Sequence, residues 1–213
     1  MYVNSSTQSP TVAVIGGGSA GSTIAIRLAM AGIHVHLIEK NASLINAPPM
    51  CHLHAGGNLY REISDEDCRM LMRQCIDIAK LYPESIDVRP TLITVPKRDN
   101  STATDLLPRL DMLTDYYQSL VDADPSNQVL GNVEDYYRVY DKQQIQQLIQ
   151  LDAKDIPTTT DEWVVAALKV MDFEKLQYPI IAVQEFGWNI FRLSASAFLQ
   201  LQRLQRAQVH LNA

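Results

Sequence analysis

The chain has 213 residues, of which 46% are apolar and 20% charged, and its formal net charge is −6 at pH 7. This length predicts one domain or two small ones with a sizeable core, and the negative charge without a basic run makes nucleic acid an unexpected partner. No stretch approaches 18 consecutive apolar residues, so no transmembrane segment is expected.

The N-terminal sequence MYVNSSTQSP is polar and uncharged, which is not the pattern of a signal peptide. The three cysteines, Cys51, Cys68 and Cys75, are too few for a disulfide framework. Both observations favour a protein of the reducing cytoplasm.

The first forty residues predict a strand, a glycine turn, a helix and a second strand. TVAVIG, residues 11–16, is short and rich in β-branched residues, which is typical of a buried strand. The helix ends at Gly32, a residue suited to a helix C-terminus, and its expected apolar stripe is Ile24, Ala25, Leu28 and Ala29. HVHLIEK, residues 34–40, predicts the second strand.

Residues 41–63 have no periodicity and contain two prolines and two glycines, so a long loop is expected there. Ser64 opens a helix with Asp67 at the capping-box position, and its apolar face is expected to include Cys68, Leu71, Met72, Cys75, Ala79 and Tyr82. The remaining elements are expected as strands at 90–96, 133–140, 178–188 and 208–212 and as helices at 104–121, 141–150, 158–171 and 192–206.

The strongest motif is Gly16-x-Gly18-x-x-Gly21, which follows an expected strand and opens an expected helix. An acidic residue, Glu39, stands at the end of the next expected strand. This context is the fingerprint of a dinucleotide-binding site. Gly16 permits a tight turn, Gly18 allows the backbone to approach a pyrophosphate, and Gly21 allows helix and strand to pack closely. Glu39 can accept hydrogen bonds from the adenosine ribose hydroxyls. The alternative is a glycine turn that binds no ligand.

The choice between FAD and NAD depends on the part of the chain after the second strand. A nicotinamide enzyme usually returns quickly to further βαβ units, whereas this chain leaves the sheet for about 150 residues and returns only near residue 208. That excursion favours FAD. We therefore expect an α/β fold, in which a Rossmann-like FAD-binding domain (1–63 and 187–213) is interrupted by an α+β segment of a substrate or cap domain (64–186), which is expected to be incomplete.

At this point the chain resembles the FAD-dependent oxidoreductases that include D-amino-acid oxidases, L-2-hydroxyglutarate dehydrogenases and malate:quinone oxidoreductases. The resemblance is carried by VAVIGGGSAGSTIAIRLAMAGIHVHLIEK, by HAGG at 54–57, and by GWNIFRL at 187–193 with the later QVHLN segment. It covers residues 11–60 and about 184–213. It implies that residues 50–58 line the flavin, and that His54 is positioned as in relatives that attach the flavin covalently. Most members of the family hold FAD noncovalently, so noncovalent binding is expected and covalent attachment through His54 is the alternative.

These observations give one expected set of cofactor-binding residues: Gly16, Gly18, Ser19, Ala20, Gly21, Glu39, Lys40, Met50, His52, His54, Ala55, Gly56, Gly57 and Asn58. A metal site at Cys51, His52 and His54 is the competing interpretation of the loop, but the sequence shows no second pair of ligands, and no metal is expected.

The resemblance implies hydride transfer from a small amino or hydroxy acid to flavin N5, and a substrate carboxylate would require an arginine. Arg61, Arg89 and Arg192 are the candidates, and His52 or Tyr60 could polarise the reacting group. No catalytic base is assigned. A quinone acceptor would place the protein at the inner membrane surface.

Family members generally run well past 213 residues, so the resemblance also implies that this chain is an N-terminal portion, which puts its activity alone in doubt. An exposed sheet would favour association, either with another copy or with a missing C-terminal segment. Two other functions stay open: a noncatalytic nucleotide-binding or interaction module, and an NAD-dependent dehydrogenase.

Overall fold

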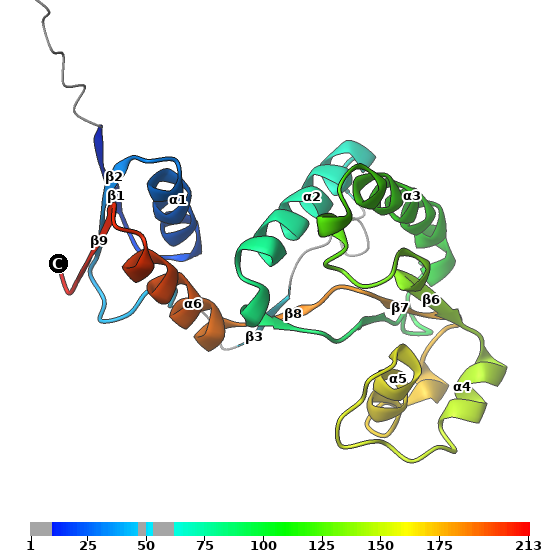
Figure 1. Cartoon of the computed structure of the whole chain (residues 1–213). Coiled ribbons are helices and arrows are strands. Elements are labelled where there is room, and N and C mark those ends of the chain that lie inside the picture. Colours follow the sequence, from blue (N-terminus) through cyan, green and yellow to red (C-terminus); the bar gives the residue numbers. More distant parts are fainter. Residues whose placement is uncertain (1–9, 47–49, 53–61) are drawn as a thin grey trace, which may run out of the picture. The chain divides into compact units, whose positions relative to one another are not determined.

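The computed structural model describes residues 10–46, 50–52 and 62–213, and it divides the chain into two compact units (Figure 1). Within the described residues, unit 1 combines the chain up to Cys51 with Tyr82–Ser85 and Trp188–Ala213. Unit 2 contains the described residues from His52 to Leu81 together with Ile86–Gly187. None of the helices in the described part of the chain is long and apolar enough to cross a bilayer.

Unit 1 is built on a parallel three-stranded sheet with the order β1-β2-β9. Its strands and helices are β1 (Thr11–Ile15), α1 (Ser19–Met30), β2 (His34–Glu39), α6 (Ile190–Arg203) and β9 (Ala207–Leu211). The last strand therefore returns to pair with β2, as the sequence predicted. Helices α1 and α6 lie on the same side of this sheet (Figure 1).

Helix α1 buries small and β-branched residues against the sheet, namely Ser22, Ala25, Ile26 and Ala29. The expected stripe was wrong at Ile24, which is 51% exposed. The buried positions follow the spacing i, i+3, i+4, i+7 from Ser22, which directs position 24 away from the sheet. The helix ends as predicted at Gly32, which has a φ of +86°.

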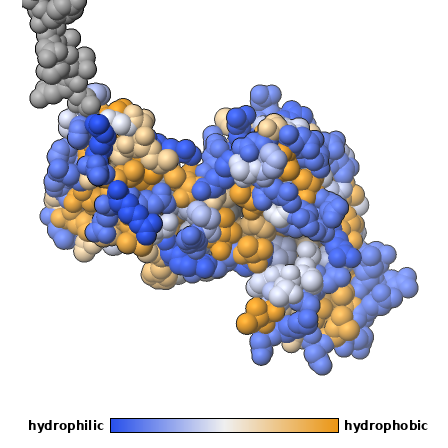
Figure 2. Space-filling view, viewed as in Figure 1, coloured by the Kyte–Doolittle hydropathy of each residue, from blue (hydrophilic) through white to orange (hydrophobic). Residues whose placement is uncertain are grey.

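The expectation of a buried first strand was also wrong. Along β1, exposed residues alternate with half-buried ones, and Ile15 is 76% exposed. The reason is that β1 is an edge strand of the described sheet, and α1 and α6 cover only one face of that sheet. Other apolar side chains of unit 1 also stay exposed, including Met30, Phe191 and Leu199, and apolar surface is visible on this unit in Figure 2.

Unit 2 is built on an antiparallel sheet with the order β5-β7-β6, formed by β5 (Thr91–Ile93), β6 (Tyr137–Tyr140) and β7 (Ile180–Val183). All four residues of the central strand β7 are buried. Helices α2 (Asp65–Leu81) and α3 (Leu107–Ala123) lie on one side of the sheet, and α4 (Lys142–Leu148) and α5 (Thr160–Leu168) on the other (Figure 1).

A third sheet has the order β3-β8-β4, with β3 (Met50–His52), β4 (Ile86–Asp87) and β8 (Gly187–Asn189). Strand β3 lies inside the segment that was expected to be loop throughout. The short helices are η1 (Pro83–Ser85), η2 (Ala103–Leu106), η3 (Pro125–Asn127), η4 (Val133–Asp135) and η5 (Phe173–Lys175).

Three expected strands are shorter than predicted. The segment 90–96 forms only β5, and a local hydrogen bond interrupts each of the other two segments. The segment 178–188 forms β7 and the start of β8, because Glu185 N donates to Val183 O at 2.8 Å and turns the chain between them. The segment 133–140 begins as η4 and becomes a strand only at Tyr137, because Tyr136 N donates to Val133 O at 3.1 Å. In both segments local hydrogen bonds replace the inter-strand bonds that alternation predicted.

The prediction for helix α2 is confirmed. Asp67 N donates to Ser64 Oγ at 3.1 Å, and Ser64 Oγ donates to Asp67 Oδ2 at 2.7 Å, so the two residues cap the helix together. Its buried face contains the expected Cys68, Met72, Cys75 and Ala79.

Candidate functional site

The glycine turn after β1 contains two glycines that the fold itself requires. Gly16 has a φ of +97°, and its N–H donates to Ile38 O at 2.8 Å, which ties the turn to β2. A Cβ on Gly21 would lie 1.9 Å from Gly16 O, so helix α1 can approach the turn only if position 21 has no side chain.

Gly18 differs from these two residues. Its φ of −65° and ψ of −177° are open to any L-residue, and a Cβ built there meets no atom within 4 Å. Packing within the described chain therefore does not require a glycine at this position. The space in front of it is open, so a ligand can approach the backbone here closely.

Gly18 is also the N-cap of α1, and no side chain caps this helix. The first turn, which begins at Ser19 and Ala20, contains no acidic residue. Its backbone N–H groups and the positive end of the helix dipole are therefore available to an anion. Gly18 O accepts the first helical bond from Ser22 N at 2.9 Å, so the turn is already formed.

Glu39 lies at the end of β2 and is buried, with 6% of its surface exposed. Its Oε2 accepts a hydrogen bond from Gly17 N at 2.5 Å, and its Oε1 accepts from Asn41 N at 2.8 Å and from Asn41 Nδ2 at 2.6 Å. The backbone N–H of Asn41 and that of Gly17 hold the pKa of this carboxyl below its ordinary value. Glu39 is therefore an anion that fixes the glycine turn and the loop after β2.

The loop after β2 packs directly on the turn. Ile45 N donates to Gly17 O at 2.8 Å, and a Cβ on Gly17 would lie 2.5 Å from Leu44 Cδ2. Ile45 is buried with a φ of +52°, an uncommon conformation for a β-branched residue. From α6, Ser194 Oγ donates to Leu44 O at 2.6 Å, which attaches the loop to that helix.

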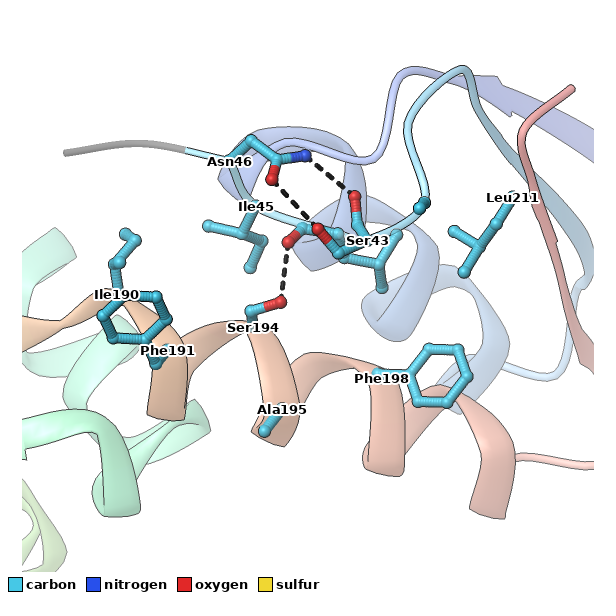
Figure 3. Close-up of a pocket in the computed structure, with 11 residues that line it drawn as sticks. Ser43, Ile45, Asn46, Ile190, Phe191, Ser194, Ala195, Phe198 and Leu211 are labelled. Carbon is cyan, nitrogen blue, oxygen red and sulfur yellow. Dashed lines mark hydrogen bonds between the residues drawn. The ribbon is translucent and has the colours of Figure 1, made fainter. Parts of the chain in front are cut away.

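A cavity of about 450 Å³ opens between this loop, α6 and the end of β9 (Figure 3). Its polar part is formed by Ser43 and Asn46, which hydrogen-bond each other through Ser43 Oγ to Asn46 Oδ1 at 2.9 Å and Asn46 Nδ2 to Ser43 O at 3.0 Å. Its lining is mostly apolar: Ala42, Leu44, Ile45, Ile190, Phe191, Ala195, Phe198 and Leu211, together with Ser194. Its size is in the range of small-molecule sites.

The structure brings the first group of expected site residues together at the glycine turn: Gly16, Gly18, Ser19, Ala20, Gly21 and Glu39. Lys40, the residue after Glu39, is exposed. Met50 and His52 belong to β3, but nothing is described of their side chains. The rest of the flavin-facing loop lies outside the described residues: His54, Ala55, Gly56, Gly57 and Asn58.

The three candidate arginines fall in different parts of the chain. Arg89 is half-buried in unit 2, Arg192 is exposed on α6 in unit 1, and Arg61 lies outside the described residues, as does Tyr60. Among the described residues no group of three or more His, Cys, Asp or Glu side chains could hold a metal ion. The side chains of Cys51, His52 and His54, for which a metal site was the competing interpretation, lie outside the described ones.

Several residues at the site were not identified from the sequence. Asn41 supplies two of the three described hydrogen bonds to the Glu39 carboxylate, and Ser194 reaches the loop from 150 positions away. An Asn two residues after the acidic residue is a local signal that could have been noticed, because Asx side chains commonly bond nearby groups. The long-range partner on α6 gives no such signal.

The parallel sheet, the uncapped helix behind a glycine turn and the acidic residue at the end of β2 make unit 1 a Rossmann-like fold of the FAD-binding type. Residues 11–84 match the family model of glucose inhibited division protein A, which is about a third of the chain and includes the whole glycine fingerprint. No curated protein matches the chain by sequence.

Solved structures resemble the chain at low identity. L-proline dehydrogenase from P. horikoshii superposes with a TM-score of 0.55 at 14% identity, over 96% of this chain and 43% of that chain. NikD, an amino acid oxidase essential for nikkomycin biosynthesis, gives a TM-score of 0.49 at 14% identity, over 96% and 44%. Glycine oxidase from Geobacillus kaustophilus gives 0.47 at 12%, over 94% and 46%. The chain thus spans less than half of each, and of the three the first establishes the shared fold.

Proposed function

We propose that unit 1 binds FAD at the glycine turn. The observation that carries this proposal is Gly18, whose missing side chain is not required by its own backbone conformation or by any neighbour within 4 Å. A ligand that approaches the backbone closely explains this glycine. The uncapped N-terminus of α1 supplies the complementary donors for a pyrophosphate.

Glu39 is the proposed acceptor for the adenosine ribose. A carboxylate offers about four acceptor positions, and three are used by Gly17 N, Asn41 N and Asn41 Nδ2. One ribose hydroxyl can therefore bond to Glu39 directly, whereas a second one would have to displace the Asn41 amide. The depressed pKa of Glu39 keeps it an acceptor at neutral pH.

We further propose that the chain is the FAD-binding portion of an oxidoreductase that acts on a small amino or hydroxy acid. FAD supplies the hydride acceptor, while the protein supplies orientation and electrostatics. The support is the fold shared with L-proline dehydrogenase. The cytoplasmic location, the carboxylate substrate and the division of roles between the two units belong to this proposal. Covalent attachment through His54 stays the alternative to noncovalent FAD.

The first test is an absorbance spectrum of the purified chain after incubation with FAD and gel filtration. Retained flavin bands near about 375 and 450 nm are the expected result, and a colourless protein that cannot be reconstituted would overturn the proposal. Acid precipitation then separates the two modes of attachment. Yellow colour in the pellet indicates a covalent link, which His54→Ala should abolish, and colour in the supernatant indicates noncovalent FAD.

The matched variant is Gly18→Ala. Its methyl group would occupy the open space before α1, so FAD affinity should fall at least about tenfold, a difference of ~1.4 kcal/mol in binding free energy. The apoprotein should lose only the difference between Gly and Ala at an N-cap, about 1 kcal/mol or less. Equal FAD affinity in wild type and Gly18→Ala would contradict the assignment of the turn.

Bleaching of the bound flavin by an amino or hydroxy acid distinguishes an oxidoreductase from a noncatalytic FAD-binding module. Binding of NADH without FAD would favour a dehydrogenase.

A further inference from the structure

Unit 2 contains a cavity of its own, with a volume of about 330 Å³. Three segments of the unit line it: the link between β4 and β5, the start of α5, and the residues that come after β7. Most of its walls are apolar, formed by Val88, Pro90, Pro157, Trp163 and Phe186. The polar lining residues are Arg89, Thr158, Thr159, Thr160 and Gln184. A space of this size accommodates a compact small molecule.

Arg89 is the one cation among the described lining residues, and it is half-buried. Its guanidinium group lies against the backbone of Gly187, where a Cβ would come within 2.7 Å of Nη2 and 2.9 Å of Nε. Among the described residues, this guanidinium makes no hydrogen bond and no ion pair. A guanidinium group keeps its charge and its five donors when it is partly desolvated, so a position of this kind favours an anionic ligand.

The carboxylates at the start of α5 do not serve as the partner of Arg89. Asp161 accepts a hydrogen bond from Tyr140 Oη at 2.6 Å and lies 3.1 Å from Arg138 Nη1. Glu162 pairs with Lys154 and accepts a bond from Thr158 N at 2.8 Å, and these contacts lower its pKa to about 2. Both carboxylates are thus already neutralised by other groups.

We propose that this cavity binds a small monocarboxylate with a flat apolar body. The Arg89 guanidinium would hold the carboxylate through paired N–H groups, and Trp163 and Phe186 would enclose the apolar part. One cation among the described lining residues suits a single negative charge better than a phosphate monoester, which carries about −1.5 to −2 at pH 7. Arg89 is also one of the arginines expected for a substrate carboxylate, but this proposal does not rest on FAD binding, because every residue that carries it belongs to unit 2.

The two tryptophans of the chain, Trp163 and Trp188, provide a direct readout. The full chain, labelled with ¹⁵N, gives one indole N–H signal for each, and Trp163→Phe assigns them. Titration with phenylacetate should move the Trp163 signal along a saturable curve with a dissociation constant on the order of 1 mM, while the Trp188 signal stays in place. No saturable shift up to about ten times that concentration would overturn the proposal, as would equal shifts of both signals.

Charge and geometry at Arg89 are tested separately. Arg89→Gln should weaken phenylacetate binding at least about tenfold, whereas Arg73→Gln, which changes an exposed arginine on α2 of the same unit, should leave it unchanged. Gly187→Ala keeps the charge but displaces the guanidinium, so binding should weaken several-fold. A dispersed amide spectrum and a cooperative urea-unfolding transition in each variant verify that the chain is folded.

Two other ligands complete the test. Phenylacetamide, which has the same shape without the charge, should bind at least about tenfold more weakly. Inorganic phosphate should compete poorly with phenylacetate. Equal binding of the amide would show that the cavity recognises only apolar shape, and competition by phosphate at equal concentration would show a general anion site; either result contradicts a monocarboxylate site.

Discussion

The sheets of the two units differ in how many faces of their central strand are buried. In unit 2, strand β7 is buried on both faces: Ile180 and Ala182 pack into one cluster with residues of α4 and α5, and Ile181 and Val183 point to the other face by strand alternation. In unit 1, β2 buries Val35, Leu37 and Glu39 but leaves its other face half-buried or exposed in the described chain.

The two units also differ in the kind of contact that stabilises each of them. Unit 1 depends on close approach of backbone to backbone, as at Gly16 and Gly21, and a buried carboxylate connects the turn to the next loop. Unit 2 depends on side chains that reach across the interior, such as Tyr117. Unit 1 should therefore be most sensitive to added atoms, and unit 2 to removed polar atoms.

Gly21→Ala should have the largest effect on unit 1. The added methyl group would lie 1.9 Å from Gly16 O, which is a backbone atom and cannot move away cheaply. We expect a loss at or above the upper end of the ~1–3 kcal/mol typical of overpacking, measured by urea unfolding and located by faster hydrogen exchange of the β2 amides. Gly18→Ala is the control, and it should cost about 1 kcal/mol or less, because Ala is a poorer N-cap than Gly. A destabilisation shared equally by the two variants would contradict the roles assigned to these glycines.

The local part of unit 1 could be predicted because its signals lie close together in sequence. The glycine spacing, the helix after it and Glu39 fall within about thirty residues, and each type of residue has one physical task there. The exposure of Ile15 could not be predicted, because it depends on which elements cover the sheet. The positive φ of Ile45 could not be predicted either, since an isoleucine gives no sign of a left-handed conformation.

In unit 2 the sequence predicted the helix α2 well but did not predict which strands pair. The helix at Ser64 was recognised from its cap and its apolar spacing. The pairing of Ile93 with Ile181 joins strands that are almost ninety residues apart, and alternation in either segment does not name its partner. The roles of the flavin-facing loop and of His54 stay predictions, because the described residues do not include them.

Tyr117→Phe should have the largest effect in unit 2 among polar truncations. The Tyr117 hydroxyl accepts a hydrogen bond from Leu130 N at 3.0 Å and donates to Gly131 O at 2.9 Å, and the ring is buried. Removing it leaves a buried N–H without its partner, which costs ~1–3 kcal/mol. Urea unfolding should show this loss, whereas Tyr116→Phe on the same helix should not. Equal unfolding midpoints for the two variants would mean that water replaces the lost hydroxyl.

The smallest expected effect is the pH dependence that Glu39 gives to unit 1. Its folded pKa lies below the ordinary value of 4.5, first because of the backbone N–H of Asn41 and then because of that of Gly17. The stabilisation is therefore fully present above pH 4.5 and is lost as the pH falls through the folded pKa. Glu39→Gln should remove this dependence, because the amide places a donor against the donors of Gly17 or Asn41.

The measurement is urea unfolding of wild type and Glu39→Gln over a pH series, with Glu84→Gln as the matched control, since Glu84 is an exposed glutamate of the same unit. The gap between wild type and Glu39→Gln should be widest above pH 4.5 and narrow in acid, while the Glu84→Gln curve tracks wild type throughout. A gap that is constant with pH would mean that position 39 acts through its shape and not through its charge. In that case the carboxylate would not be the group that joins the glycine turn to the loop after β2.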